Sequence, residues 1–158
     1  EDIIRLGCKF AILGSGEKIY EDFFSEMHYR YPDRVGLTIG FVPELSKKIY
    51  AGADMFLMPS QSEPCGLAQM IALRYGTIPI VRETGGLRDS IHDAGDKNGN
   101  GFTFKSYNAH DMLDAVVRAR AYYDDKMKWG RLVNTALKQN FSWTKSAKDY
   151  IALYNDIH

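Results

Sequence analysis

Short apolar runs alternate along the chain with longer stretches in which apolar residues recur at helical spacing. Apolar runs of strand length occupy residues 8–13, 35–41, 53–58, 78–81 and 101–104. Short strands that are apolar on both sides are typical of a parallel sheet covered by helices on both faces. Because parallel strands are joined by right-handed crossovers, the pattern predicts an α/β fold, a Rossmann-like doubly wound parallel sheet followed by C-terminal helices.

Helical segments are predicted between the strands and after the last one, at residues 18–29, 44–50, 66–75, 111–123, 125–139 and 143–158. Residues 84–87 and the polar, glycine-rich residues 93–101 are predicted as loops. The first seven residues have the pattern of a final helical turn that Gly7 ends. Since a protein rarely starts within a helix, we expect an excised piece of a longer chain, with a processed terminus as the alternative.

The loop after the predicted strand 53–58 carries the chemistry that points most directly to a ligand. In open parallel sheets, ligands bind at the carboxyl ends of the strands. If a helix begins at Gly66, the N–H groups of Gly66 and Leu67 point out of its N-terminus and offer a site for a phosphate. Glu63 would then accept hydrogen bonds from the hydroxyls of a sugar attached to that phosphate. The alternative is a tight turn that needs a glycine, with Glu63 as a solvated loop acid.

A second loop, after the predicted strand 78–81, contains the paired glycines Gly85 and Gly86 directly after Thr84. Glycines let a backbone approach a phosphate or sugar closely, so this loop is a candidate for the same ligand. The alternative, which these residues alone favour, is a turn that needs a positive φ. Gly14 and Gly16 follow the first predicted strand but lack the third glycine of the dinucleotide-binding fingerprint.

Composition and charge exclude several classes of function. Lys and Arg number 20 and Asp and Glu number 20, so the net charge of zero gives no basic field for nucleic acid or an anionic membrane. The two cysteines, Cys8 and Cys65, form no Cys-x-x-Cys pair, which argues against a disulfide scaffold or zinc site and favours the cytoplasm. The chain has no Asp-x-Asp pair for a metal–diphosphate complex, and no apolar run of the roughly 18 residues that span a membrane.

Four segments together resemble the core of the bacterial glycogen synthase and plant starch synthase family: residues 54–60, 63–67, 74–79 and 84–89. The resemblance extends over essentially the whole chain and is most specific between Ala51 and Asp89. It implies that residues 1–158 form a single Rossmann-like donor-binding domain, the C-terminal half of a GT-B glycosyltransferase without its first strand and N-terminal domain. The family transfers glucose from ADP-glucose to the non-reducing end of an α-1,4-glucan with retention, and it needs no metal or other cofactor.

The resemblance also implies roles for individual residues. Glu63 would be the catalytic carboxylate that binds the donor glucose, and the N–H groups of Gly66 and Leu67 would hold the diphosphate. The other donor-binding residues would be Phe41, which stacks on adenine, Cys65, which lines the sugar pocket, and Thr84, Gly85 and Gly86, which border the glucose and the distal phosphate. Ile71 stands where many related transferases have a second glutamate, which leaves Glu63 as the motif's one carboxylate.

The family places further parts of the enzyme upstream of Glu1. These parts are the Arg and Lys that neutralise the diphosphate and the N-terminal domain that binds the acceptor. The isolated piece is therefore expected to bind ADP weakly, if at all, and to transfer nothing. The expected partners are ADP-glucose and an α-1,4-glucan, with no nucleic acid and no membrane. Two alternatives stay open: the donor domain of another GT-B transferase that uses UDP-glucose, and a stand-alone nucleotide-sugar-binding module.

Overall fold

The computed structural model describes residues 1–157, in which strands alternate with helices. The strands are β1 (Phe10–Gly14), β2 (Val35–Ile39), β3 (Met55–Met58), β4 (Ile78–Arg82) and β5 (Phe102–Phe104). The helices are α1 (Asp2–Arg5), α2 (Lys18–Arg30), α3 (Pro43–Gly52), α4 (Ala68–Tyr75), α5 (Gly85–Ser90), α6 (Ala109–Asp124), α7 (Lys126–Leu137) and α8 (Trp143–Ile157). This order confirms the predicted α/β class and the helices after the last strand.

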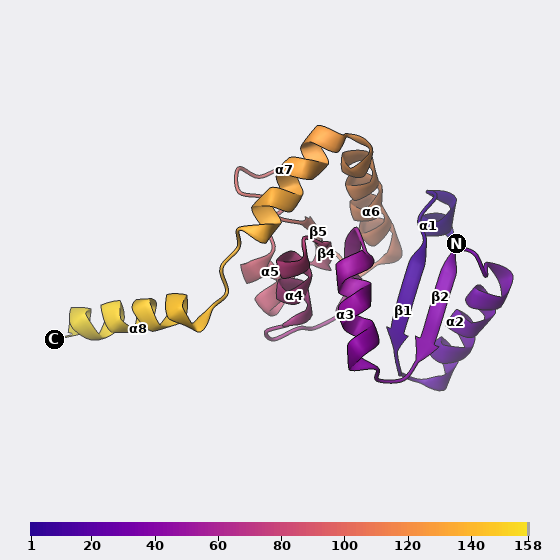
Figure 1. Ribbon diagram of the computed structural model, residues 1–158, viewed down its shortest axis with the longest axis horizontal. Coiled ribbons are helices and arrows are strands. Elements are labelled where there is room, and N and C mark those ends of the chain that lie inside the picture. The colour runs from indigo at the N-terminus through magenta and orange to yellow at the C-terminus, as the bar shows by residue number, and fades with distance from the viewer. Residues whose placement is uncertain (158) are drawn as a thin grey trace.

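The strands of the described residues form two parallel sheets (Figure 1). In the first sheet β1 pairs with β2, in register from Phe10 opposite Val35 to Gly14 opposite Ile39. In the second sheet β4 lies between β3 and β5 and is parallel to both. The predicted parallel architecture is confirmed, but its strands are divided between two sheets. We call the two sheets with the helices that pack on them the β1–β2 unit and the β3–β5 unit. Helix α1, which leads into β1, contacts α6 and so joins the two units.

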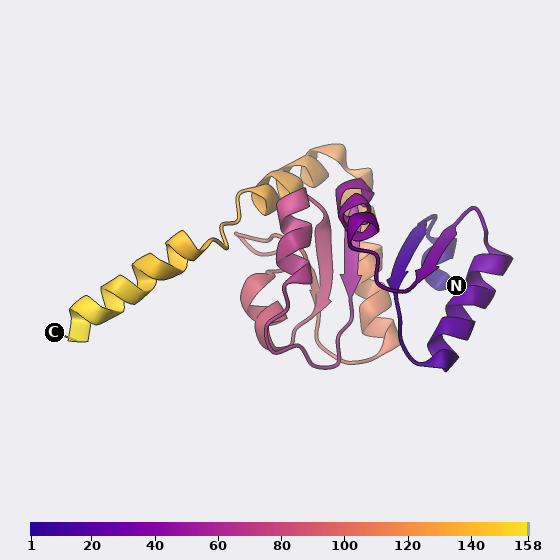
Figure 2. The ribbon, with the colours of Figure 1, turned by 60° about the horizontal axis from the view of Figure 1, so that its bottom comes forward.

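The hydrophobic core surrounds the central strand β4. Helices α4 and α6 cover opposite faces of the β3–β5 sheet (Figure 2), and α7 packs against both helices. The residues of this core are Leu73, Ile78, Ile80, Val81, Leu87, Ile91, Phe102, Phe104, Ala115, Val116, Ala119, Leu132 and Ala136. Burial of so many aliphatic and aromatic side chains gives the unit its stability and makes the sheet edge a rigid support for loops.

Helix α5 was not expected from the sequence, which predicts a loop at residues 84–87. Its first two residues, Gly85 and Gly86, have poor helix propensity, so the pattern gives no local sign of a helix. Tertiary contacts form it: Leu87 is fully buried, and the Ser90 hydroxyl donates a hydrogen bond to the Gly86 carbonyl at 2.6 Å. Packing therefore outweighs propensity in this segment.

Helix α8 extends away from both units (Figure 1), and none of its residues is buried. It begins at Trp143, as the sequence predicts, but the connection before it starts at residue 138, because α7 ends at Leu137, two residues earlier than predicted. No helix within residues 1–157 combines the length and the apolar character needed to span a membrane.

Candidate functional site

The candidate site lies at the carboxyl edge of the β3–β5 sheet, where two loops meet. The first loop, residues 59–67, follows β3, and the second, residues 83–84, follows β4 and leads into α5. Because β3 and β4 are parallel neighbours, their carboxyl ends lie at the same edge of the sheet. Both loops lie below the sheet in Figure 2. The structure therefore brings together the two loops that the sequence selects as candidate ligand sites.

Backbone contacts that require glycine hold the two loops together. The Gly86 N–H donates a hydrogen bond to the Glu63 carbonyl, with an N···O distance of 3.1 Å. A Cβ atom at Gly85 would overlap the Glu63 carbonyl, and one at Gly86 would overlap the Cys65 carbonyl. Any side chain at either position would force the loops apart, because protein interiors are close-packed. The paired glycines thus fix the position of the loop that carries Glu63 and Cys65.

The turn at Gly66 places two free N–H groups at the start of α4. Gly66 has a φ of 68°, a left-handed conformation that residues with a Cβ rarely adopt. The helix consequently begins at Ala68, two residues later than predicted. Among residues 1–157, the N–H groups of Gly66 and Leu67 have no hydrogen-bond acceptor. They precede an eight-residue helix whose dipole favours negative charge at this end.

The other predicted site residues differ in their surroundings. Glu63 and Thr84 are half-buried, whereas Cys65 is exposed. All three residues are therefore at least partly accessible to solvent where the two loops meet. Phe41 follows β2, on the other sheet, and 91% of its surface is exposed. The structure does not bring Phe41 together with the two loops, and its ring lies open on the β1–β2 unit.

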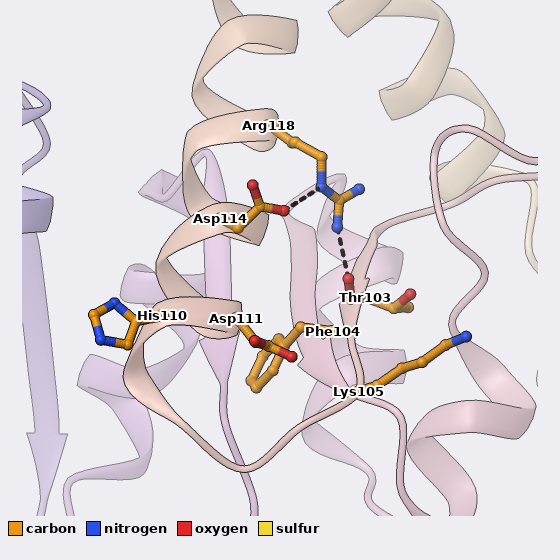
Figure 3. A pocket seen from close by; sticks show the side chains of 7 residues that line it. All are labelled: Thr103, Phe104, Lys105, His110, Asp111, Asp114 and Arg118. Carbon is orange, nitrogen blue, oxygen red and sulfur yellow. Dashed lines mark hydrogen bonds and ion pairs between the residues drawn. The ribbon is translucent and has the colours of Figure 1, made fainter.

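A polar hollow between β5 and α6 is a second place where charged groups gather (Figure 3). Arg118 donates hydrogen bonds to both carboxylate oxygens of Asp93, at 3.0 and 2.8 Å, and also to Asp114 and to the Thr103 carbonyl. Burial alone would raise the pKa of Asp93, but hydrogen bonds from Arg118 and from the N–H groups of Thr103 and Gly95 outweigh it, and the pKa lies below its ordinary value. The charges of Arg118 and Asp93 are thus satisfied within the protein, as in a structural ion pair.

Thr103, whose carbonyl accepts a hydrogen bond from Arg118, also supports the second loop. The Thr103 hydroxyl donates to the Glu83 carboxylate at 2.7 Å, and Glu83 directly precedes Thr84. On the other side, the Arg82 guanidinium donates to the Gln61 carbonyl at 2.7 Å and so holds the first loop. Sequence reasoning missed Glu83 and Arg82 as loop supports, because their partners lie about twenty residues away and no local pattern indicates them.

Gln69 is a third residue that sequence reasoning missed. It is fully buried in α4, and its side-chain amide donates to the carbonyls of Cys65 and Gly66. One signal was available: Gln69 stands three and four residues before Ala72 and Leu73, on the apolar face of the predicted helix. A polar residue in that position must find buried hydrogen-bond partners.

No three His, Cys, Asp or Glu side chains are placed to hold a metal ion within the part of the chain that the structure describes. The charged group nearest the free N–H groups along the chain is Glu63, a half-buried carboxylate in the same loop. The independence of the site from metals stays a prediction.

The family model described as "Glycosyl transferases group 1" matches residues 5–131. The chain belongs to this family. The glycogen synthases of Anoxybacillus flavithermus and Bacillus anthracis are 52% and 55% identical to it over 158 residues, which are 99% of this chain and 33% of each relative. This group 1 glycosyl transferase chain therefore spans about a third of the length of the curated relatives that it matches.

Solved structures also resemble this group 1 glycosyl transferase chain. The catalytic domain of starch synthase IV from Arabidopsis thaliana, bound to ADP and acarbose, matches with a TM-score of 0.86 and 40% identity, over 97% of this chain and 33% of that chain. HepE from Anabaena, in complex with UDP and glucose, matches with a TM-score of 0.69 and 15% identity, over 98% of this chain and 43% of that chain. At this identity the match shows a shared fold alone. The matches confirm the predicted family resemblance and the Rossmann-like fold of a GT-B transferase half.

Proposed function

We propose that the chain is the donor-binding domain of a glycogen synthase, which transfers glucose from ADP-glucose to the non-reducing end of an α-1,4-glucan with retention. The observation that carries the proposal is the pair of free N–H groups at Gly66 and Leu67, in the loop that also contains the half-buried Glu63. The identity to curated glycogen synthases and the 40% identity to a starch synthase domain that is bound to ADP support this assignment.

Stabilisation of the leaving group is the main contribution of this domain in the proposed reaction. As the bond between the anomeric carbon and the phosphate oxygen breaks, negative charge develops on ADP. The N–H groups of Gly66 and Leu67, at the positive end of the α4 dipole, would stabilise that charge by donating hydrogen bonds to the phosphate oxygens. They are fixed before the reaction begins, so little reorganisation is required when the charge appears.

Orientation of the sugar is the proposed role of Glu63. Its carboxylate accepts hydrogen bonds from the donor glucose hydroxyls and holds the anomeric carbon in place. The acceptor hydroxyl oxygen forms the new glycosidic bond on the face from which ADP departs, and its proton passes to a phosphate oxygen of the donor. No residue of this chain is assigned as a covalent nucleophile. Basic residues outside this chain would complete the neutralisation of the diphosphate.

The remaining assignments concern the two ends of the donor. Phe41 stacks on the adenine, for which its open ring face is suited. Cys65 and Thr84 border the glucose, while Gly85 and Gly86 keep the two loops close enough for both to reach it. The acceptor glucan binds outside this chain, no metal takes part, and the reaction takes place in the cytoplasm. We propose no nucleic-acid or membrane partner.

The test is a Glu63→Gln substitution in the full-length protein that contains this chain. Transfer from ADP-glucose to glycogen should fall about a hundredfold, because a loosely oriented donor reacts slowly even when it is bound. Glu44→Gln is the matched control: it makes the same chemical change on an exposed α3 side chain paired with Lys47, and it should leave transfer unchanged. Unchanged turnover in Glu63→Gln would remove Glu63 from the site.

The wild-type protein should also be assayed with both nucleotide sugars. Stacking on Phe41 does not by itself distinguish adenine from uracil, so the donor preference needs a direct comparison of ADP-glucose with UDP-glucose. Faster transfer from ADP-glucose supports the proposal, whereas transfer from UDP-glucose alone would assign the chain to another branch of GT-B transferases. Binding of ADP-glucose without transfer by the full-length protein would favour a binding module.

A further inference from the structure

The side chain of Gln69 is fully buried directly beneath the Gly66 turn. Its amide nitrogen Nε2 lies 3.2 Å from the Cys65 carbonyl, 2.9 Å from the Gly66 carbonyl and 3.1 Å from the Ser90 hydroxyl oxygen. Because carbonyl oxygens only accept hydrogen bonds, the nitrogen and not the oxygen of the amide must face them. The orientation of the Gln69 amide is therefore determined by its neighbours.

These contacts fix the direction of two peptide units. The Cys65 carbonyl shares a peptide plane with the Gly66 N–H, and the Gly66 carbonyl shares the next plane with the Leu67 N–H. Among residues 1–157 all peptide bonds are trans, so each N–H points opposite to its carbonyl. Since Gln69 holds both carbonyls toward the interior, the N–H groups of Gly66 and Leu67 must point away from it.

Stability of the fold does not explain a glutamine at this position. The Gln69 oxygen Oε1 is buried and has no hydrogen-bond partner among the described residues. A buried acceptor without a donor is destabilising, and a side chain of similar size without polar atoms would avoid that penalty. The hydrogen bonds that the glutamine makes all go to the turn and to Ser90.

Ser90 extends the same contacts to the second loop. Its hydroxyl accepts from Gln69 and donates to the Gly86 carbonyl at 2.6 Å, while the Gly86 N–H donates to the Glu63 carbonyl. A closed series of hydrogen bonds thus joins Gln69, Ser90, Gly86 and the loop of Glu63. Displacement of Gln69 would loosen both loops at the point where they meet.

We propose that Gln69 is a positioning residue for donor binding: its buried amide turns the Gly66 and Leu67 N–H groups outward, toward the diphosphate. The inference rests on the proposed function, because it assigns those N–H groups to a diphosphate. Gln69 itself does not touch the donor.

The experiment uses Gln69→Met in the full-length protein, since methionine has a similar length and no hydrogen-bond donor. Without the Gln69 amide, the Gly66 and Leu67 N–H groups should no longer be aligned with the diphosphate. Because hydrogen bonds to charged groups contribute strongly to affinity, ADP binding should weaken about tenfold to a hundredfold. Binding of adenosine, which has no phosphates, should not change, and the KM for glycogen should stay constant while the KM for ADP-glucose rises. A purely structural role would weaken ADP and adenosine binding alike, and that result would overturn the proposal.

Two further variants keep the test decisive. Thr77→Val is the control for loss of a buried polar group away from the site, because the Thr77 hydroxyl donates to the carbonyls of Tyr50 and Ala53. The ratio of ADP affinity to adenosine affinity in this variant should match that of the wild type.

Ser90→Ala removes one partner of Gln69 and should weaken ADP binding by about two- to tenfold. If Gln69→Met does not fold, unchanged ADP affinity in Ser90→Ala overturns the inference.

The two proposals fail in different ways. If the wild-type protein does not bind ADP, the proposed function is wrong, and with it the basis of this inference. If the wild type binds ADP and Gln69→Met retains its affinity and its preference for ADP over adenosine, the role of Gln69 alone is wrong.

Discussion

The two sheets of this molecule differ sharply in how well they are packed. In the β3–β5 unit the apolar residues of β4 are almost completely buried, and helices cover both faces. In the β1–β2 unit, Met27 and Val35 are the buried apolar residues, while Ile19 and Phe23 on α2 are exposed. The candidate diphosphate and glucose site lies on the densely packed unit, whereas the proposed base-stacking residue Phe41 lies on the sparsely packed one.

The two kinds of proposed donor contact need different support. Peptide N–H groups and a carboxylate act at defined positions, so the loops that carry them must be held by a rigid sheet and by specific hydrogen bonds. An aromatic ring that stacks on a base tolerates more movement, because stacking depends on contact area and little on direction. Substitutions in the β3–β5 unit should therefore affect the free energy of unfolding strongly, whereas substitution of Phe41 in the β1–β2 unit should affect ADP binding with little change in stability.

The largest expected difference between the units is in stability. Leu73 is fully buried in α4, so Leu73→Ala should lower the free energy of unfolding by about 2–5 kcal/mol. Ile19→Ala, on the exposed face of α2, should change it by less than about 0.5 kcal/mol. Urea unfolding of the full-length variants measures both, and equal losses would show that the two units are equally well packed.

A smaller effect is expected where the two loops meet. Gly86→Ala would place a Cβ against the Cys65 carbonyl, which should destabilise the protein by about 1–3 kcal/mol and displace Glu63. Glucosyl transfer should therefore fall more than stability alone explains. Gly130→Ala is the control, because a Cβ at Gly130 meets no atom within 4 Å and the residue lies within helix α7. If Gly86→Ala kept full transfer activity, the close contact of the loops would not matter for function.

The Asp93–Arg118 ion pair gives the β3–β5 unit a pH-dependent contribution to stability. Since the pKa of Asp93 is lowered in the folded state, its contribution is complete above the unfolded pKa of about 3.9 and is lost as the pH falls through the folded value. Asp93→Asn should therefore lower the free energy of unfolding by about 1 kcal/mol at pH 7 and by progressively less below pH of about 4. Unfolding experiments across this range measure the difference, and a constant difference at all pH values would contradict the pairing.

The smallest effect on stability is expected at Phe41. Because the ring is exposed, Phe41→Ala should change the free energy of unfolding by less than about 0.5 kcal/mol. Loss of stacking should nevertheless weaken ADP binding about fivefold to a hundredfold. Calorimetric titration with ADP checks this, with Tyr29→Ala as a matched control, since Tyr29 is an aromatic residue of similar exposure on α2. Equal ADP affinity in Phe41→Ala and the wild type would remove Phe41 from the site.

Much of the fold was predictable because its signals are local. The apolar run at residues 78–81 predicted a strand, which the structure places at the centre of its sheet, and the regular apolar spacing at residues 111–123 predicted helix α6. The division into two sheets was not predictable, since strand pairing depends on contacts between residues far apart in the chain. Helix α5 was missed for a related reason, because buried Leu87 and not propensity holds it.

The candidate site shows the same limit. The residues around Gly66 were selected because glycine and a helix start form a local pattern, although Gly66 proved to lie before the helix, with a positive φ. The paired glycines Gly85 and Gly86 were selected as ligand neighbours, and the structure shows that their Cβ positions face the Glu63–Cys65 backbone. That partner lies about twenty residues earlier in the chain, so sequence spacing could not indicate it.

The central claim is that the N–H groups of Gly66 and Leu67 bind the diphosphate of the donor. A crystal structure of the full-length protein with ADP tests it most directly. The account predicts phosphate oxygens about 2.9 Å from both nitrogens, with the Gln69 amide still bonded to the Cys65 and Gly66 carbonyls. A diphosphate bound elsewhere, with both N–H groups still free, would contradict it.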